Sequence, residues 1–290
     1  MALKTLIISA DAGGMRTGDY IRTLFPDLQE SAIRKLFSAR DVKLDGSPVS
    51  RDTALKSGQE LKIYLPDKAV PARILRVVYE DEDILLVNKP AGVSVEHDAP
   101  GSISLTELCR LYLTESGPCL FPPVPCHRLD HRTCGLIIFA KNSRALEIMQ
   151  DAFRSRSLDK YYICLVRGMM KPPEAVCSAY LLKDASRSRV RILDHPAPGA
   201  LPITTGYETV ESGAVSRLKV HLITGRTHQI RAHLAAMGHP VLGDDLYGDR
   251  MFNKAQKARS LKLCAVSLTM HTGGLLPNLD GRVFSIDPPF

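Results

Sequence analysis

Hydrophobic positions in the N-terminal part of the chain switch between helical and strand-like spacing. Apolar side chains recur at helical intervals over residues 17–25 and 31–40, which predicts two short helices, the second capped by Ser31. Apolar or alternating runs predict strands at residues 5–9, 41–50 and 60–66. The pattern therefore predicts a compact unit of two helices and a few strands that ends near Leu65.

The pattern changes after a stretch with two prolines at 66–73, which is typical of a linker. Helical spacing predicts helices at residues 104–115, 143–157 and 228–238, and β-rich runs predict strands at 160–168, 187–193, 204–212 and 215–224. Ser104 is placed to cap the first of these helices, with Glu107 three residues on. Because strands and helices mix without a regular βαβ order, we expect an α+β fold and not a doubly wound sheet.

Composition and charge place the chain among ordinary globular proteins. Of its 290 residues, 44% are hydrophobic and 24% charged, and the formal net charge of +7 is compatible with a polyanionic partner such as nucleic acid. The seven cysteines include no C-x-x-C pair, which favours reduced thiols. No apolar run approaches the roughly 18 residues of a membrane helix, and the N-terminus is unlike a signal peptide. We therefore expect a cytoplasmic protein without a membrane partner.

Basic side chains gather on the polar side of the N-terminal unit. They are Arg16, Arg22, Arg34, Lys35, Arg40 and Lys43. Such a run is either a solvated helix face or a surface that binds phosphates. The order of elements over residues 14–65 resembles the small RNA-binding domain of ribosomal protein S-four, and this resemblance implies that Arg34 and Lys35 contact RNA. We expect an S-four-like domain at 1–65, a linker at 66–73 and a larger domain at 74–290.

Three polar clusters stand apart from the fold pattern of the larger part. The stretch "CHRLDHRTCGLIIFA" at 126–140 places Asp130 among histidines and arginines, just before an apolar run. Lys160, Tyr161 and Tyr162 open a predicted strand, and "TGRTHQIR" at 224–231 leads into a predicted helix. Functional sites commonly lie at such strand ends and helix starts.

The first cluster resembles the catalytic motif of the RluA-type pseudouridine synthases, H-R-L-D-x-x-T-S-G-L. Further stretches of that family follow in the same order: "NKPAG", the K-x-Y strand start, "TGRTHQIRAHLAAMGHPVLGDDLYG" and a "PP" near the C-terminus. The likeness runs from about residue 74 to the end. It implies a central mixed, largely antiparallel sheet flanked by helices. It also implies an enzyme that isomerises uridine to pseudouridine in structured ribosomal or transfer RNA, without a cofactor.

The reaction implied by this resemblance suits a carboxylate at residue 130. The bond between ribose and N1 of uracil must break and form again at carbon 5. A carboxylate can attack a sugar carbon, add to the base or take a proton from the ribose, and these routes stay open. Taken alone, Asp130 would be a structural cap or a surface ion pair. The family motif makes it the catalytic residue, and Arg231 would pair with it and keep it ionised.

The resemblance implies roles for further residues around the aspartate. Arg128 would take the place of a target base that has left its stack, or contact a phosphate. The ring of Tyr162 would hold the uracil, and Leu263 would line the same pocket. For Arg226 and Lys89 two roles stay open, binding of RNA phosphate and bracing of a loop.

Two cysteines depart from the family pattern. Cys134 stands where the family usually has serine, and Cys264 where many members have histidine. Thiol catalysis at Cys134 would need a paired base, which the sequence does not indicate. His228 and His233 are five residues apart, which misses the i, i+4 spacing of a zinc helix, so we predict no metal. No glycine-rich phosphate loop is present, so we predict no nucleotide cofactor.

Two other kinds of protein remain as alternatives. One is a catalytically silent RNA-binding protein or RNA-folding chaperone, although such a protein would be free to lose Asp130, Tyr162 or Arg231, and all are present. The other is an aspartate-dependent hydrolase, which would need a second carboxylate or a metal. The sequence identifies neither the RNA nor the uridine position. It also does not fix the oligomeric state, for which a monomer is the default expectation.

Overall fold

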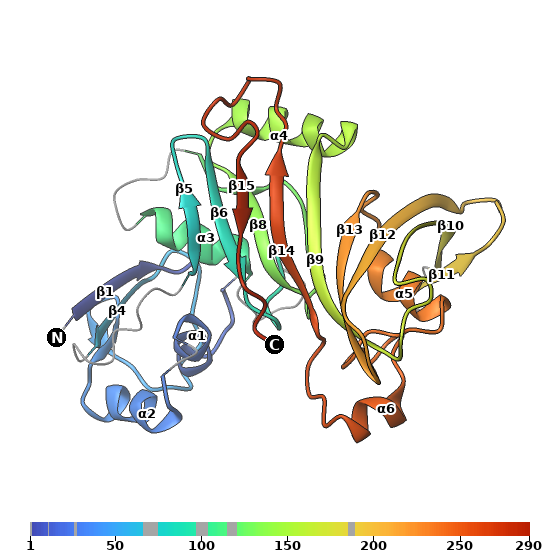
Figure 1. Cartoon of the computed structure of the whole chain (residues 1–290). Coiled ribbons are helices and arrows are strands. Elements are labelled where there is room, and N and C mark those ends of the chain that lie inside the picture. Colours follow the sequence, from blue (N-terminus) through green and yellow to red (C-terminus); the bar gives the residue numbers. More distant parts are fainter. Residues whose placement is uncertain are drawn as a thin grey trace. The chain divides into compact units, whose positions relative to one another are not determined.

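The computed structural model describes residues 2–10, 12–25, 28–65, 75–96, 104–114, 121–184 and 189–290 (Figure 1). The chain divides into two compact units, one formed by 1–76 with 93–124 and the other by 77–92 with 125–290. The predicted linker at 66–73 lies outside the described residues. The expected boundary at 74 remains a prediction, and the smaller unit takes up a later segment of the chain.

The smaller unit contains an antiparallel sheet in the order β1-β4-β2-β3. Its strands are β1 (Ala2–Ile7), β2 (Val42–Leu44), β3 (Ser47–Pro48) and β4 (Glu60–Leu65). Its helices are α1 (Thr17–Leu24), α2 (Glu30–Ser38) and α3 (Leu105–Thr114). The apolar positions predicted to face inward do so, since Ile21, Leu24, Ile33 and Leu36 are buried. The likeness to the S-four domain stays a prediction.

Helix capping follows the sequence prediction at α3 and differs at α2. Ser104 accepts a hydrogen bond from the backbone N–H of Glu107 at 3.1 Å, as expected of a cap. The prediction that Ser31 caps α2 is wrong, because the helix begins at Glu30 with Gln29 as its N-cap. Glu30 favours the earlier start, since a carboxylate in the first turn interacts well with the helix dipole.

The larger unit is built on one long sheet whose main path runs β11-β10-β12-β13-β9-β14-β8-β6-β5, with β15 paired to β14. Its first strands are β5 (Val77–Glu80), β6 (Ile84–Lys89), β8 (Cys134–Ala140), β9 (Leu158–Arg167) and β10 (Glu174–Asp184). The later strands are β11 (Arg189–Leu193), β12 (Leu201–Glu211), β13 (Val215–Leu222), β14 (Leu263–Met270) and β15 (Val283–Ser285). The two-residue strand β7 (Val124–Pro125) lies at the division between the units.

This sheet confirms the expected α+β class with a mixed, largely antiparallel arrangement. Strands β8 and β14 pair in parallel, whereas the other paired strands along the main path are antiparallel. Strand β14, from near the C-terminus, lies between β8 and β9 (Figure 1). Gly135 permits this close pairing, because its φ is +119° and a Cβ there would lie 2.2 Å from the carbonyl oxygen of Ala265.

Helices α4 (Ser143–Ser155), α5 (Gln229–Ala236) and α6 (Arg250–Ala255) accompany the sheet. Asn142 caps α4 by accepting a hydrogen bond from the N–H of Ala145 at 2.7 Å, and Met149 of α4 is fully buried. Helix α5 lies beside β11 and β12 (Figure 1), and its residues from Gln229 to Leu234 are all buried. This burial fixes the helix that carries Arg231.

Strand β9 explains how the sheet presents polar side chains to one face. Its residues alternate in burial, so Lys160 and Tyr162 point to the same side as Cys164. Tyr162 belongs to an apolar cluster with Leu129 and Leu263, which come from segments far apart in the chain. Leu129, Tyr162 and Leu263 of this cluster also border the space beside Asp130.

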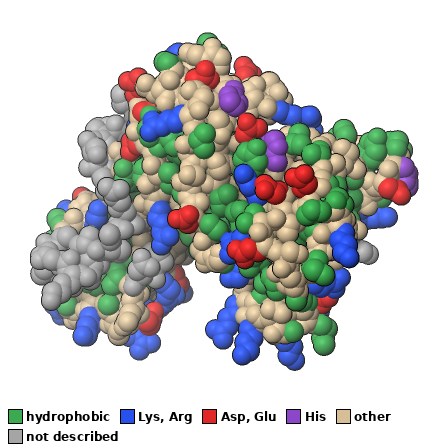
Figure 2. Space-filling model, viewed as in Figure 1, with side chains coloured by type: hydrophobic (Ala, Val, Ile, Leu, Met, Phe, Trp, Pro, Cys, Tyr) green, Lys and Arg blue, Asp and Glu red, His purple; other side chains and the backbone are tan. Residues whose placement is uncertain are grey.

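Basic side chains are exposed on both units. In the larger unit, Figure 2 shows Lys and Arg side chains gathered at the lower end, where Figure 1 places α6. Exposed basic residues of that region are Arg250, Lys254, Lys257 and Arg259. Within the part of the chain that the structure describes, no helix combines the length and apolar character needed to cross a bilayer.

Candidate active site

Asp130 lies in the turn that leads into β8. The backbone N–H of Thr133 donates to the carbonyl oxygen of Asp130 at 3.0 Å and closes this turn. Leu129, the preceding residue, is buried in the apolar cluster and anchors the segment. The Asp130 side chain keeps 20% of its surface exposed, so its carboxylate is fixed at one end and open to a ligand at the other.

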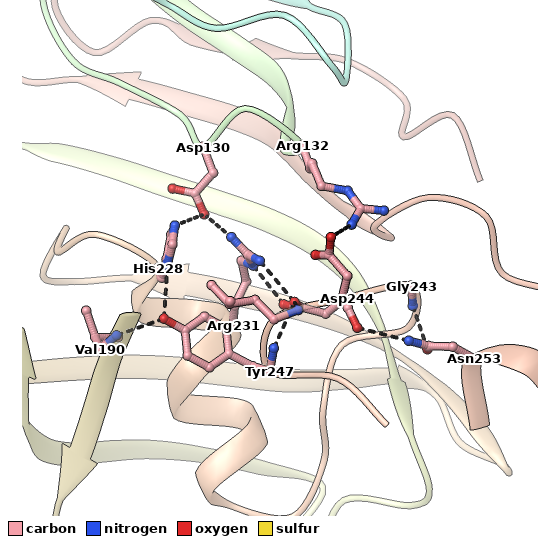
Figure 3. A network of polar contacts seen from close by, with 11 residues as sticks. Asp130, Arg132, Val190, His228, Arg231, Gly243, Asp244, Tyr247 and Asn253 are labelled. Carbon is pink, nitrogen blue, oxygen red and sulfur yellow. Dashed lines mark hydrogen bonds and ion pairs between the residues drawn. The ribbon is translucent and has the colours of Figure 1, made fainter. Parts of the chain in front are cut away.

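Arg231 holds this carboxylate from the buried helix α5. Its Nη1 donates to Asp130 Oδ2 at 2.9 Å, while Nε and Nη2 donate to the two carboxylate oxygens of Asp244 at 2.7 and 2.9 Å (Figure 3). The guanidinium is thus shared between two acids, and its planar fork sets the direction of both contacts. The predicted pairing of Arg231 with Asp130 is confirmed.

Asp244 is the buried anchor of this network. Its side chain has 0% of its surface exposed, and Oδ1 also accepts the N–H groups of Leu246 and Tyr247 at 2.8 and 3.0 Å. Burial acts to raise the pKa of Asp244, but Arg231 and the two N–H donors outweigh it and hold the pKa below its ordinary value. Burial likewise opposes the charge of Arg231, and the two carboxylates raise its pKa in spite of it. Both groups are therefore charged.

His228 approaches Asp130 from the other side. Its Nε2 lies 3.8 Å from Asp130 Oδ2, and its Nδ1 lies 3.0 Å from the hydroxyl of Tyr247 (Figure 3). That hydroxyl accepts the N–H of Val190 at 2.9 Å, which leaves its own proton free to be donated to Nδ1. This assignment places the ring proton on Nε2, toward Asp130. Burial lowers the pKa of His228, which favours this neutral form.

A pocket of about 130 Å³ opens beside Asp130. Its lining includes Tyr162 and Leu263 on the sheet side, and Arg128, Thr133, Gly225 and Arg226 around its edge. Tyr162 is 7% exposed, and burial together with the charge of Asp130 raises the pKa of its phenol, so the hydroxyl keeps its proton at neutral pH. The Thr133 hydroxyl is buried and has no hydrogen-bond partner among the described residues. The pocket thus joins a carboxylate, an aromatic ring and one hydroxyl without a partner among the described residues.

Comparison with known proteins shows what this chain is similar to. The model of the RNA pseudouridylate synthase family matches residues 83–236. An uncharacterized RNA pseudouridine synthase of Aquifex aeolicus (strain VF5) is 32% identical over 290 residues, covering 94% of this chain and 90% of the relative. The chain belongs to the RNA pseudouridylate synthase family. It is therefore an enzyme of the RNA pseudouridine synthase class, and its RluA-type motifs are family motifs.

Other family members support the same assignment. The ribosomal large subunit pseudouridine synthase C of Escherichia coli (strain K12) is 31% identical over 267 residues, covering 87% of this chain and 82% of the relative. The solved structure of human RNA pseudouridylate synthase domain containing 1 has a TM-score of 0.58 at 26% identity, covering 74% of this chain and 90% of that one. Human RNA pseudouridylate synthase domain containing 4, with a TM-score of 0.61 at 23% identity, shares the fold.

The structure brings most of the residues predicted from the family motifs to one pocket. Asp130, Tyr162, Arg231, Leu263, Arg128 and Arg226 all line it. Arg128 and Arg226 are exposed, as contact with RNA requires. Arg34 and Lys35 are exposed on α2 in the smaller unit, and their contact with RNA stays a prediction.

Lys89 lies at the end of β6 and has 0% of its surface exposed. Its Nζ donates to the carbonyl oxygens of Pro90 and His131, each at 3.1 Å, which ties the "KPAG" turn to the segment after Asp130. Burial lowers the pKa of Lys89 to about 8, while the nearby acids oppose this shift. Of the two predicted roles, the burial favours bracing of the loop over contact with RNA phosphate.

Three residues of the network were not predicted from the sequence: Asp244, His228 and Tyr247. His228 was considered there only as a metal ligand. All three lie in the quoted family stretch "TGRTHQIRAHLAAMGHPVLGDDLYG", so the motif contained the signal. What the motif cannot show is that Asp244, the first of two adjacent aspartates, is buried against Arg231 while Asp245 is exposed and pairs with Arg132.

The two cysteines that depart from the family pattern lie outside the pocket. Cys134 and Cys264 occupy paired positions on β8 and β14 and pack in a cluster with Val266. The Cys134 thiol donates to the carbonyl oxygen of Leu263 at 3.6 Å. Within the described residues, no group of three or more His, Cys, Asp or Glu side chains is arranged to hold a metal ion.

Proposed function

We propose that the protein converts specific uridines of ribosomal RNA to pseudouridine, with Asp130 as its catalytic carboxylate. The observation that supports this most strongly is the ion pair between Asp130 and Arg231 at a pocket lined by Tyr162. Relatives named ribosomal large subunit pseudouridine synthase C favour RNA of the large ribosomal subunit as the substrate.

The chemistry is an isomerisation that leaves the composition of the nucleoside unchanged. The bond between C1′ of ribose and N1 of uracil breaks, the base turns, and C1′ bonds to carbon 5, which then loses its proton while N1 gains one. Asp130 must be ionised to attack the sugar, to add to the base or to accept a ribose proton. Its contact with Arg231 and the turn closed by Thr133 give the carboxylate the fixed position that each route needs.

Tyr162 and Thr133 act on the base in this proposal. The buried ring of Tyr162 provides a flat surface against which a detached uracil can turn without leaving the pocket. The Thr133 hydroxyl has no hydrogen-bond partner among the described residues, and because it is enclosed it would reach the polar edge of the base only after a rotation of its side chain. Both groups hold the uracil near C1′ until the new bond forms.

Arg128 and Arg226 act on the RNA around the base. A uridine reaches the pocket only after leaving its stack, and the exposed guanidinium of Arg128 can fill the vacated place by stacking. Arg226, exposed on the opposite segment of the pocket edge, contacts the backbone. The smaller unit adds affinity through Arg34 and Lys35 on α2.

A hydrolase mechanism with two carboxylates finds less support. Asp130 is the one acidic residue lining the pocket among the described residues. Asp244, the nearest further carboxylate in the network, is fully buried and uses both oxygens on Arg231. It has no free oxygen directed at a second substrate face.

The test is release of tritium from large-subunit ribosomal RNA labelled at carbon 5 of uridine. Wild-type protein should release tritium, and Asp130→Asn should lower the rate by on the order of 10²–10⁴-fold while the melting temperature stays close to that of wild type. Asp194→Asn is the matched control, because this carboxylate is 95% exposed and pairs only with neighbouring His195 among the described residues. Release that Asp130→Asn leaves intact would refute the role of Asp130, and no release by wild type would refute the substrate.

A further inference from the structure

A second hollow of about 580 Å³ adjoins the pocket at Asp130. It is bounded by the end of α4 with the turn that follows, by the start of β9, and by the segments at 126–128 and 222–226. The two cavities share a wall formed by Arg128, Tyr162, Leu222, Gly225 and Arg226. A strand of RNA with one nucleotide at Asp130 would therefore pass directly into this hollow.

The charged side chains that line the hollow are all basic. Its lining contains five cationic residues and, among the described residues, no carboxylate: Arg128, Arg154, Arg156, Lys160 and Arg226. Arg154 forms an ion pair with Asp151 at 2.6 Å on the exposed face of α4. The other four make no ion pair with any described residue, so the positive charge of the hollow is largely uncompensated within the larger unit.

Lys160 is the residue that distinguishes this hollow from an exposed basic surface. It is only 8% exposed, and its ammonium makes neither a hydrogen bond nor an ion pair with the described residues. The ammonium lies 5.7 Å from the centre of the Phe153 ring, and a Cβ on Gly225 would be 3.8 Å from Nζ. The Lys160 ammonium is not among the enclosed polar atoms without a partner in the described residues, so it faces the hollow, where a ligand can supply the acceptor that no described protein group provides.

Two ring side chains stand beside Lys160 in the lining of the hollow. His127 stacks on Phe153 with ring centres 4.7 Å apart, and its Nε2 accepts the N–H of Ile138 at 3.1 Å. Burial and the nearby Lys160 lower the pKa of His127 to about 3, so this ring is neutral at physiological pH. The hollow thus offers a preformed cationic group beside an aromatic surface, without a competing acceptor from His127.

We infer that this hollow is a phosphate subsite, in which Lys160 binds a backbone phosphate of the RNA next to the uridine at Asp130. The inference rests on the proposed function for the identity of the RNA. A phosphate oxygen would supply the acceptor that Lys160 lacks, and the three N–H donors of an ammonium suit such a group. Arg156 and Arg128 flank the same space and add charge. A phosphate held in this hollow would fix the position of the target nucleotide's sugar in the adjoining pocket at Asp130.

Binding is measured on the Asp130→Asn background by fluorescence anisotropy with a labelled oligouridylate over a range of salt concentrations. Lys160→Met removes the buried charge. Lys219→Met is the matched control, because Lys219 lies between the inward-facing Leu218 and Val220 on β13 and points to the other side of the sheet. Loss of one phosphate contact lowers the slope of log Kd against log salt by about 0.7 for a single strand. We expect this decrease for Lys160→Met and no change for Lys219→Met.

A second variant and a free anion complete the test. Arg156→Asn changes an exposed residue whose left-handed backbone suits asparagine, so it keeps the fold and should also lower the slope. If Lys160→Met melts far below wild type, the slope of Arg156→Asn alone decides. Inorganic phosphate is added to wild type and Lys160→Met in a separate melting experiment. Stabilisation of wild type by inorganic phosphate with unchanged RNA slopes would overturn the RNA assignment in favour of a free anion.

Failure of this inference is separable from failure of the proposed function. Tritium release is measured for Lys160→Met without the Asp130 change, and we expect a higher KM with a smaller effect on kcat. If wild type releases tritium but both variants keep the wild-type slope and Lys160→Met keeps the wild-type KM, the phosphate subsite is refuted while the synthase activity stands. If wild type releases no tritium, the proposed substrate is wrong, and the slopes still decide whether Lys160 binds phosphate.

Discussion

The ion pair between Arg231 and Asp244 is buried, and its effect on stability can be measured by replacing one partner and then both. Arg231→Met leaves Asp244 ionised with 0% of its surface exposed and without its guanidinium. Removing one partner of a buried ion pair costs about 3–5 kcal/mol. We therefore expect Arg231→Met to lower the free energy of unfolding by that amount at pH 7.

The compensating change is Asp244→Asn. Asparagine removes the charge but keeps an amide oxygen that can accept the N–H groups of Leu246 and Tyr247. The double variant then loses three hydrogen bonds of Arg231, at about 0.5–1.5 kcal/mol each, but leaves no buried charge unpaired. We expect it to be more stable than Arg231→Met alone, with a coupling free energy on the order of 2 kcal/mol between the two sites.

The pH dependence gives a further check. In wild type the pKa of Asp244 is held below its ordinary value of 3.8, so its stabilising contribution is complete above that pH and is lost as the pH falls below it. In Arg231→Met the isolated buried carboxylate has a raised pKa and can take up a proton. The difference in stability between wild type and Arg231→Met should therefore shrink as the pH falls from 7 toward 4.

Urea unfolding at several pH values measures these differences, and tritium release is followed in parallel. Neither Arg231→Met nor the double variant should release tritium at the wild-type rate, because Asp130 has lost the guanidinium that orients it. The reasoning is refuted if the double variant is no more stable than Arg231→Met, or if the difference in stability stays constant with pH.

Two further changes test the surroundings of Asp130. Tyr247→Phe leaves the buried N–H of Val190 without its acceptor, which should cost about 1–3 kcal/mol in urea unfolding. It also removes a hydrogen bond that stabilises neutral His228, so the pKa of His228 should rise. The acidic limb of the pH profile of kcat/KM should then move to higher pH. An unmoved limb would show that the protonation of His228 does not control activity. Lys89→Met tests the buried amine, whose pKa of about 8 lies below its ordinary value of 10.5. Between these values the unfolded chain binds more protons, so wild-type stability should rise with pH relative to Lys89→Met, and parallel curves would contradict the shift.

Several local elements of the larger unit followed from the sequence because their signals are local. The strand predicted at 160–168 is β9 (Leu158–Arg167), and the helix predicted at 228–238 is α5 (Gln229–Ala236). The β-rich run in β9 and the helical spacing in α5 can be recognised from neighbouring residues alone. Helix α2 shows the limit of such signals, since it begins at Glu30, one residue before the serine that was expected to cap it.

The arrangement of the site required information that is not local. The family motif predicted that Arg231 meets Asp130, residues that lie 101 positions apart in the chain. It could not predict that Asp244 takes the other two donors of the guanidinium, because two adjacent aspartates look alike until burial separates them. The sequence also did not predict that Lys89 is buried, because a lysine before a turn is most often exposed.

The position of β14 between β8 and β9 determines when this enzyme can become active during its synthesis. Strands β8 and β9 follow each other in the chain, yet they do not pair along the sheet, because β14 occupies the place between them. Until residues 263–270 have left the ribosome, the sheet can exist only as two halves, each with an unpaired edge open to aggregation. Leu263, which completes the pocket at Asp130, arrives with that same strand. A nascent or truncated chain that ends before β14 would therefore have neither a continuous sheet nor the complete pocket at Asp130.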